Sequence, residues 1–373
     1  MSQYEDKLKQ ITREELITNK LKLVYQEMNS KFDFIDRISL SLYDSDCDSL
    51  TTYIHYTSNG DPLNRYQSVL SDSKSLNKIA KSGEPRIVND MSVYDSVKKR
   101  HSEQLKKFGF KSSYTYPIYN KSQFYGFIFI NSCQINAFAD DVLEQITPLI
   151  HLIAALTVIE FSIINSLTST VKTALVMSHH RDPETGEHLD RMARYSRLIA
   201  MGVAQKYNLD DEMIEHIYLF APLHDVGKIA IPDKILLKPG KLTFEEFEVM
   251  KTHSNKGLEI INTILDNYQL DGMQYIKFLR NIIHSHHEKM NGSGYPDGIS
   301  GNEIPIEARI IAVADVFDAL ASKRSYKEAW SIDEAFAELK RITGEELDSD
   351  CVDALLKNRG AIERIQTLFV DPE

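Results

Sequence analysis

The stretch LFAPLHDVGKIAIP (219–232) places two polar residues, His224 and Asp225, in an apolar segment that we expect to be helical and to stop near Gly227. A carboxylate buried without a partner is costly, so a cation should face Asp225. Lys228 can supply that charge, and this is the simpler interpretation. The alternative is a pair of metal ions bridged by Asp225, with His224 bound to one of them. The His-Asp dipeptide alone does not decide between the two.

A second apolar stretch, ARIIAVADVFDALAS (308–322), repeats this pattern with Asp315. Nine of the twelve histidines lie between residues 179 and 287, among helical segments with apolar neighbours. Such clustering favours metal binding over isolated structural roles. The candidate ligands are His188, His224, His253, His286, His287, Asp225, Asp315 and Glu184. Nitrogen and oxygen donors without thiolates suit iron, manganese or zinc, and this set could hold two or three divalent ions.

The composition is that of a folded, acidic protein. The chain has 373 residues, a formal net charge of -11, 42% hydrophobic residues and 26% charged residues. This length predicts two domains, and the negative charge argues against a surface for nucleic-acid polymers. Three widely spaced cysteines predict neither a disulfide framework nor a thiolate metal site. Together with an N-terminus that lacks an apolar export segment, they predict a cytoplasmic protein.

The N-terminal half alternates β-rich runs with helix candidates. A helix is predicted over 1–30, followed by an α+β domain with an antiparallel sheet over 31–145. The β-rich runs are RISLSLYD, TTYIHYT, SSYTYPIYN and QFYGFIFINS. Together with SGEPRIVND (82–90) and NAFADDVLEQ (136–145), their order resembles a GAF sensor domain, although a PAS-type sensor or an unrelated α+β module shares this β-rich appearance. The resemblance implies a GAF-domain ligand that the sequence does not identify.

Residues 141–180 are predicted to form a long helix between the two domains. Apolar residues between 146 and 175 recur at steps of three, four or seven, as in a parallel coiled coil that would make the protein a homodimer. A core helix within one domain explains the same spacing. The most apolar part, ITPLIHLIAALTVI (146–159), is broken by Pro148 and His151 and is shorter than the roughly 20 residues of a membrane span, so no span is expected.

Residues 181–373 are predicted to be all-α. They contain HDVGK (224–228), HHEKMNGSGYP (286–296) and ADVFDALASKRSYK (314–327), in this order. The three motifs resemble the HD-GYP domain, a subgroup of the HD phosphohydrolases that degrades cyclic di-GMP. The predicted architecture is therefore multi-domain, with an N-terminal α+β GAF-like domain, a long connecting helix and a C-terminal all-α HD-GYP domain.

The HD-GYP resemblance implies a centre of two or three divalent ions, for which iron or manganese is favoured. The residues that match the family's ligands are His188, His224, Asp225, His253, His286, His287 and Asp315. Asp225 matches the bridging carboxylate, and Glu184 matches the extra ligand of members with three metals. Glu184 can also be explained as a helix-start residue, because Asp182 could cap that helix and Pro183 could occupy its first turn.

The same resemblance implies catalytic and substrate-binding residues. Lys228 matches an active-site lysine near the scissile phosphate and joins Asp225 as a catalytic candidate. The candidate substrate contacts are Arg191, Gly294, Tyr295, Pro296, Asp318, Arg324 and Lys327, of which the last two match a phosphate-binding pair. The ring of Tyr295 is expected to form one wall of the cleft. Arg191 could balance carboxylates or reach phosphate, and Asp318 could hydrogen-bond a ligand histidine or a guanine edge.

Residues beside the motifs are predicted to have supporting roles. Glu288 should fix a histidine ring or the loop, or else be an exposed charge. Four further histidines of the C-terminal half lie outside the motifs. His179, His180 and His216 are predicted to be solvated or linker residues, and His284 is predicted to be structural or to support a ligand residue. The sequence departs from the family at Asn291, where aspartate is usual, and at Ser254, where proline is common. Neither change is expected to abolish activity.

We expect a sensor-regulated phosphodiesterase that hydrolyses cyclic di-GMP to linear pGpG, to GMP, or to both. The implied mechanism is in-line attack on phosphorus by a hydroxide that bridges the metal ions. Two alternatives stay open. One is the same chemistry on another cyclic dinucleotide, such as cyclic GMP-AMP. The other is a receptor that binds the dinucleotide without hydrolysing it, against which the intact ligand set argues.

Overall fold

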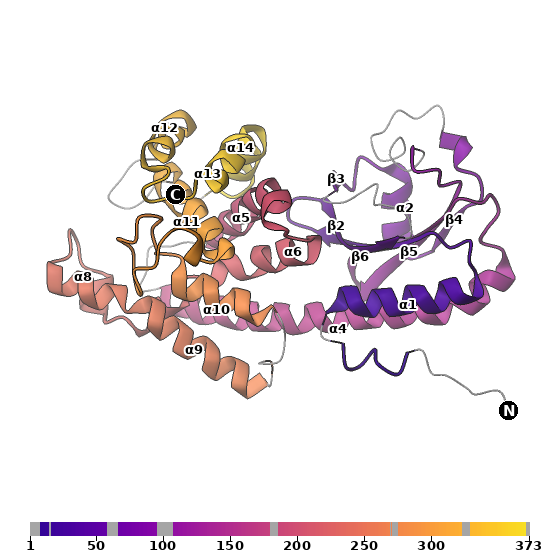
Figure 1. Ribbon diagram of the computed structural model, residues 1–373, viewed down its shortest axis with the longest axis horizontal. Coiled ribbons are helices and arrows are strands. Elements are labelled where there is room, and N and C mark those ends of the chain that lie inside the picture. Colours follow the sequence, from indigo (N-terminus) through magenta and orange to yellow (C-terminus); the bar gives the residue numbers. More distant parts are fainter. Residues whose placement is uncertain are drawn as a thin grey trace. The chain divides into compact units, whose positions relative to one another are not determined.

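The computed structural model divides into two compact units, residues 1–163 and 164–373, whose elements are drawn in Figure 1. The residues described are 8–14, 16–57, 66–94, 107–179, 186–268, 270, 275–322 and 329–370, without the side chains of 172 and 174–179. The division falls within helix α4 (Asp140–His179), which overlaps the predicted linker. The predicted domain limits are finer than this division and stay a prediction.

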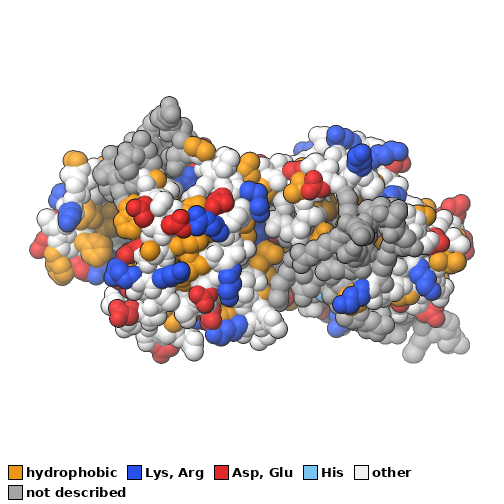
Figure 2. Space-filling model, turned by 90° about the horizontal axis from the view of Figure 1, so that it is seen from above, with side chains coloured by type: hydrophobic (Ala, Val, Ile, Leu, Met, Phe, Trp, Pro, Cys, Tyr) orange, Lys and Arg blue, Asp and Glu red, His pale blue; other side chains and the backbone are white. Residues whose placement is uncertain are grey.

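The face of the protein drawn in Figure 2 carries charges of both signs. On the face shown in Figure 2, Lys and Arg side chains are interspersed with Asp and Glu side chains. A mixed surface of this kind does not produce a strong field of one sign. Cations close to a binding site would therefore have to supply the attraction for an anionic ligand.

The N-terminal unit is built on a six-stranded antiparallel sheet, which confirms the α+β prediction. The strands are β1 (Arg37–Asp44), β2 (Ser49–Thr57), β3 (Gln67–Val69), β4 (Arg86–Val88), β5 (Ser112–Asn120) and β6 (Gln123–Ser132). Their order is β3-β2-β1-β6-β5-β4, and each paired couple runs antiparallel. A 3-10 turn, η1 (Met91–Tyr94), follows β4.

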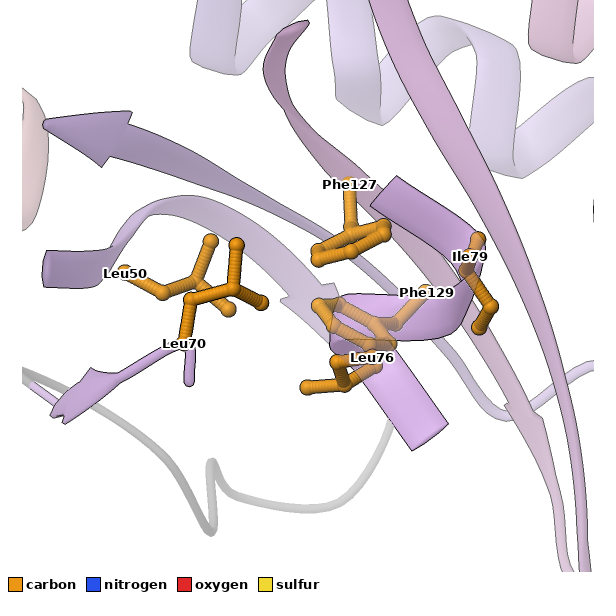
Figure 3. Close-up of a cluster of buried hydrophobic side chains, with 6 residues drawn as sticks. All are labelled: Leu50, Leu70, Leu76, Ile79, Phe127 and Phe129. Atoms are coloured by element: carbon orange, nitrogen blue, oxygen red, sulfur yellow. The ribbon is translucent and has the colours of Figure 1, made fainter. Parts of the chain in front are cut away.

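Helices cover both faces of this sheet (Figure 1). Helix α2 (Lys74–Ser82) closes one face over an apolar cluster, drawn in Figure 3, that consists of Leu50, Leu70, Leu76, Ile79, Phe127 and Phe129. Helix α1 (Ile17–Lys31) and the first half of α4 cover the other face. Tyr25 of α1 contacts Tyr56 with ring centroids 4.7 Å apart, and Tyr53 contacts Phe161 of α4 at 5.0 Å. The unit therefore has three layers, with the sheet in the middle.

Helix α1 (Ile17–Lys31) begins later than the predicted range of 1–30 implied. Its buried stripe consists of Ile17, Leu21, Val24, Tyr25 and Met28, whereas residues 8–13 form turns. The residue before the helix, Leu16, offers no side-chain cap. Burial of this stripe, rather than capping, determines where the helix begins.

Helix α4 extends well beyond the apolar segment 146–159. Residues 140–171 are long and apolar enough to cross a membrane by length and composition alone, with 39% of the most apolar window buried inside the molecule. Ile150 and Ile153 are buried, whereas Ile159 is 57% exposed. The side of α4 that carries Ile150 and Ile153 is therefore packed like a helix in the core of a domain. A homodimer through the other side stays a prediction, as does the absence of a membrane span.

The C-terminal unit is all-α in its described residues, as predicted. Its helices after α4 are α5 (Gly186–Tyr207), α6 (Asp211–Phe220), α7 (Asp233–Leu236), α8 (Phe244–Lys251), α9 (His253–Tyr268), α10 (Ile276–Ser285), α11 (Ile306–Ala321), α12 (Ile332–Ile342), α13 (Ser349–Leu356) and α14 (Arg359–Leu368). Three 3-10 turns, η2 (Ala221–Leu223), η3 (Val226–Ala230) and η4 (Gly301–Glu303), join some of them. Helices α5 and α10 pack against η2, and α9 packs against η3.

The segment that carries His224 and Asp225 is not the helix that we predicted. Helix α6 ends at Phe220, and His224 and Asp225 lie between the turns η2 and η3. Pro222 occupies the start of η2, where it has no N–H group to continue α-helical hydrogen bonding. The polar pair is therefore presented by a tight turn rather than by the side of a helix.

Gly227 lets α9 approach this turn closely. A Cβ atom at Gly227 would lie 1.8 Å from the backbone oxygen of His253 and 2.5 Å from the backbone nitrogen of Gly257. Both obstacles are backbone atoms, so any larger residue would require α9 to move. This close approach places His253 next to Asp225.

His216 lies in the core, which corrects the prediction that it is a solvated or linker residue. It is fully buried in α6, and its ring stacks on Tyr275 with centroids 3.9 Å apart. Its Nδ1 lies 2.8 Å from the carbonyl oxygen of Glu212. Burial lowers the pKa of His216 to about 4, although the hydrogen bond to Glu212 opposes the shift.

Replacing Gly227 with alanine is expected to destabilise the C-terminal unit by about 2 to 3 kcal/mol, because overpacking displaces α9. Urea unfolding followed by circular dichroism measures the change. Gly186→Ala is the matched control, since a Cβ atom at Gly186 meets nothing within 4 Å. The control should change the free energy of unfolding by about 0.5 kcal/mol at most. Equal unfolding midpoints for the two variants would contradict the close approach.

We expect His216 to make the free energy of unfolding depend on pH between about 6.5 and 4. In this window the unfolded chain binds a proton that the native imidazole does not, so stability falls as the pH is lowered. The full difference is on the order of 3 kcal/mol. Urea unfolding at several pH values should show that His216→Phe, which keeps a ring against Tyr275, is less sensitive to acid than the wild type. The same dependence of unfolding free energy on pH in both proteins would contradict this role of His216.

Candidate metal centre

Asp225 lies at the centre of the site, and its two carboxylate oxygens face different groups. Oδ1 is 3.2 Å from Nε2 of His253 and 3.6 Å from Nε2 of His286. Oδ2 is 3.3 Å from Nε2 of His224 and 2.8 Å from Nζ of Lys228. Only 7% of the side chain is exposed. Each oxygen of this buried carboxylate is therefore directed at a separate half of the site.

The predicted ligands form two adjacent groups, each compact enough for one ion. Asp225, His253, His286 and His287 form the first group, and His188, His224 and Asp315 form the second. Within each group the ligand atoms lie within 4.8 Å of one another. The residues come from α5, the turn between η2 and η3, α9, the end of α10, and α11. Three further predicted residues, Glu184, Arg324 and Lys327, lie outside the described residues.

Backbone carbonyl groups orient three of the histidines. The Nδ1 atoms of His224, His253 and His286 lie 2.8 to 2.9 Å from the carbonyl oxygens of Ala221, Met250 and Ile282. A ring that donates its Nδ1 proton in this way presents the lone pair of Nε2. The buried Nε2 atoms of His253 and His286 have no hydrogen-bond partner in the described part of the chain. Such lone pairs, aimed at a shared carboxylate, fit a metal ion.

The electrostatics of the site favour the protonation states that bind metal. Burial opposes the ionised form of Asp225, but the charge of Lys228 and the contact with His224 hold its pKa well below the usual range. Burial lowers the pKa of His286. The pKa of His287 is held well below its usual range by burial and by the neighbouring His286. At neutral pH Asp225 is therefore a carboxylate and His286 and His287 are neutral imidazoles, the forms that coordinate cations.

Asp318 and Arg191 hold the ring of His188, which is one of the two roles predicted for each of them. Asp318 Oδ2 lies 2.7 Å from Nδ1 of His188, and Arg191 donates to both carboxylate oxygens of Asp318 at 2.6 and 3.0 Å. Arg191 also donates to the carbonyl oxygen of Phe369 at 2.9 Å. Arg191 is 3% exposed and Asp318 is 1% exposed, so this network is buried. No local sequence signal indicated the contribution of Phe369, which acts through its backbone.

The loop after His287 forms a wall of the site. A Cβ atom at Gly294 would lie 2.4 Å from the backbone nitrogen of Lys289, so only glycine lets the loop fold back this closely. Tyr295 then packs on His287, with ring centroids 4.7 Å apart, and its peptide bond to Pro296 is cis. Burial raises the pKa of Tyr295, and Asp225 and Asp315 raise it further, so its hydroxyl group stays protonated.

Glu288 holds this loop, which is one of the two roles predicted for it. Its Oε1 accepts hydrogen bonds from the backbone N–H groups of Asp297 at 2.7 Å and Gly298 at 3.1 Å. The residue is 4% exposed. Asn291 accepts from the backbone N–H of Ser293 at 3.0 Å in the same turn. The departure from aspartate at Asn291 therefore leaves the turn intact.

Lys228 stays at the open edge of the site, with 18% of its side chain exposed. It can face a bound phosphate while it balances Asp225. His284 contacts Asn255, with its Nε2 3.0 Å from Oδ1, which fits the structural role predicted for it. His180 and the side chain of His179 lie outside the described part of the chain.

Comparison with known proteins matches residues 184–351 to the HD domain family. The cyclic di-GMP phosphodiesterase response regulator RpfG of Xanthomonas campestris is 49% identical over 188 residues, which are 50% of this chain and 46% of the relative. A cyclic di-GMP phosphodiesterase of Thermotoga maritima is 41% identical over 182 residues, which are 49% of this chain and 46% of the relative. The 3'3'-cGAMP-specific phosphodiesterase 2 of Vibrio cholerae is 41% identical over 178 residues, with coverages of 48% and 32%. The chain spans about half the length of these relatives, or less.

Two solved structures are similar to part of the chain. The chromophore-binding domain of the bacteriophytochrome RpBphP3 from R. palustris has 15% identity and a TM-score of 0.33, covering 42% of this chain and 59% of that one. A phycocyanobilin-bound GAF domain from a cyanobacterial phytochrome has 15% identity and a TM-score of 0.29, with coverages of 42% and 94%.

Replacing Asp318 with asparagine is expected to weaken metal binding by the His188 group about 10- to 100-fold, because the partner that orients the ring is altered. Metal content per chain, measured after dialysis against graded chelator, should show one ion lost before the other. The exposed residue Asp353 on α13 provides the control, and Asp353→Asn should behave as wild type. Loss of both ions together would argue against a separate His188 group.

Proposed function

We propose that this chain, whose residues 184–351 match the HD domain family, is a metal-dependent phosphodiesterase that hydrolyses cyclic di-GMP to linear pGpG, GMP, or both. The proposal rests on the geometry around Asp225, whose two carboxylate oxygens each face a different histidine group. Relatives that are 49% and 41% identical are named as cyclic di-GMP phosphodiesterases.

The resident cofactors of the proposed enzyme are two divalent ions, with iron or manganese favoured. The two ligand groups have nitrogen and oxygen donors, which suit these metals. A third ion would require Glu184. When bound, the ions would lower the pKa of a water molecule to near neutrality and neutralise phosphate oxygens in an in-line displacement.

The residues of the chain support this chemistry in distinct ways. Asp225 keeps the two ion sites next to each other. The ammonium group of Lys228 is directed at Asp225, and the side chain is partly exposed, so it can stabilise a phosphate oxygen beside the ions. The protonated hydroxyl group of Tyr295 can donate a hydrogen bond to substrate from the loop wall.

A second candidate substrate is 3'3'-cyclic GMP-AMP. It has specific support because a relative that is 41% identical over 178 residues is named as a 3'3'-cGAMP-specific phosphodiesterase. The geometry of the metal centre serves either phosphodiester. A non-hydrolysing receptor is a weaker candidate, since it would have no need for both complete ligand groups.

The N-terminal unit and helix α4 are proposed to regulate and to dimerise the enzyme. The N-terminal unit, with its GAF-like antiparallel sheet, would regulate the enzyme through a ligand that is still to be found. The less buried side of α4, where Ile159 is 57% exposed, would join two copies in a homodimer. The low cysteine count supports a cytoplasmic location.

Wild-type protein loaded anaerobically with iron or manganese should convert cyclic di-GMP to pGpG or GMP, as measured by chromatography of the nucleotides. Cyclic GMP-AMP is assayed beside it at equal concentration. Faster turnover of cyclic GMP-AMP would displace cyclic di-GMP as the substrate. Binding of both without cleavage, at full metal content, would favour the receptor.

Asp225→Ala should remove metal and turnover together, because both ion sites lose their shared ligand. We expect activity to fall by at least about 1,000-fold, to the level of metal-free protein. Helix content measured by circular dichroism should change little. Retained turnover in this variant would refute the bridging role of Asp225.

A further inference from the structure

Helix α8 (Phe244–Lys251) exposes two aromatic side chains. None of its residues is buried, and Phe244 and Phe247 are 74% and 45% exposed. A capping box formed by Thr243 and Glu246 nevertheless defines the helix start, and Lys238 pairs with Glu246. A short helix with a capped start and exposed aromatic side chains is suited to presenting them to a ligand.

One of these aromatic residues extends the metal centre outward. The ring of Phe247 lies 6.3 Å from that of Tyr295, at an interplanar angle of 86°. Tyr295 in turn packs on His287, a member of the first ligand group, at 4.7 Å. A row of three rings therefore leads from the ligand group to α8.

A cation lies beside the outer two rings. Nζ of Lys251 is 5.7 Å from the centroid of Phe247 and 6.0 Å from that of Tyr295. Lys251 also pairs with Glu248 at 2.7 Å, but both side chains are partly exposed, at 28% and 45%. Exposed pairs of this kind are weak, so the ammonium group can turn toward an anion.

We propose that Phe247 and Lys251 form a base-binding edge of the metal centre, on which one purine of the cyclic dinucleotide stacks while its phosphodiester reaches the ions. The inference rests on the proposed function and names two specificity residues for it. Two rings at right angles form a corner that can contact both the face and the edge of a purine. Lys251 can then contact the second phosphate of the dinucleotide, outside the metal ligands.

The test compares two phosphodiesters in the metal-loaded full chain. Bis(p-nitrophenyl) phosphate needs the ions but has no purine, whereas cyclic di-GMP has both features. Phe247→Ala should raise the ratio of the KM for cyclic di-GMP to the KM for the chromogenic ester about tenfold, as expected for the loss of one stacked base. Phe247→Trp should restore the ratio. Lys251→Gln should raise the ratio by a smaller factor, about threefold, because it removes a partly exposed contact.

Phe244→Ala is the matched control, because Phe244 is on the same helix and more exposed. It should leave the ratio unchanged. An unchanged ratio in Phe247→Ala, or equal changes in both alanine variants, would overturn the inference while leaving the proposed function in place. A wild-type protein that cleaves the chromogenic ester but neither cyclic dinucleotide would overturn the proposed function, and the inference with it.

Discussion

The negative charge of Asp225 is the constraint on which the C-terminal unit depends. Only 7% of this side chain is exposed, and a buried charge has to be balanced by cations and hydrogen bonds. Lys228 balances one oxygen, and histidines face both. The tight turn around Asp225 and the close approach of α9 at Gly227 serve this arrangement. A looser turn would separate the carboxylate from its partners.

The backbone prepares the imidazole groups for ligation before any ion is bound. The Nδ1 atoms of His224, His253 and His286 lie within hydrogen-bond distance of backbone carbonyl oxygens, and a ring that donates from Nδ1 carries its lone pair on Nε2. Burial keeps His286 and His287 neutral by lowering their pKa values. Lone pairs buried in this way are unfavourable without a cation, so metal binding and the stability of this unit are coupled.

Burial separates the polar residues of the site into two kinds. Arg191 and Asp318 are almost fully buried, and they hold His188 through a charged network that ends at the Phe369 carbonyl. Lys228 and Phe247 are partly exposed at the edge of the centre, where a substrate can reach them. The buried residues maintain geometry, and the exposed ones are available for recognition.

The sequence by itself predicted the fold classes and the seven residues that the structure brings together in two groups able to hold metal ions. Period-2 and helical patterns are local properties, and carboxylates such as Asp225 and Asp315 stand out in apolar segments because a buried carboxylate needs a cation to balance it. Asp318 and Arg191 are 127 positions apart, so no local pattern indicated that they pair. The burial of His216 and the end of α6 at Phe220 were missed for a related reason, since each depends on how neighbouring segments pack. Only the tertiary structure decided which side chains support the site and which face a ligand, because burial and choice of partner arise from contacts between segments far apart in the chain.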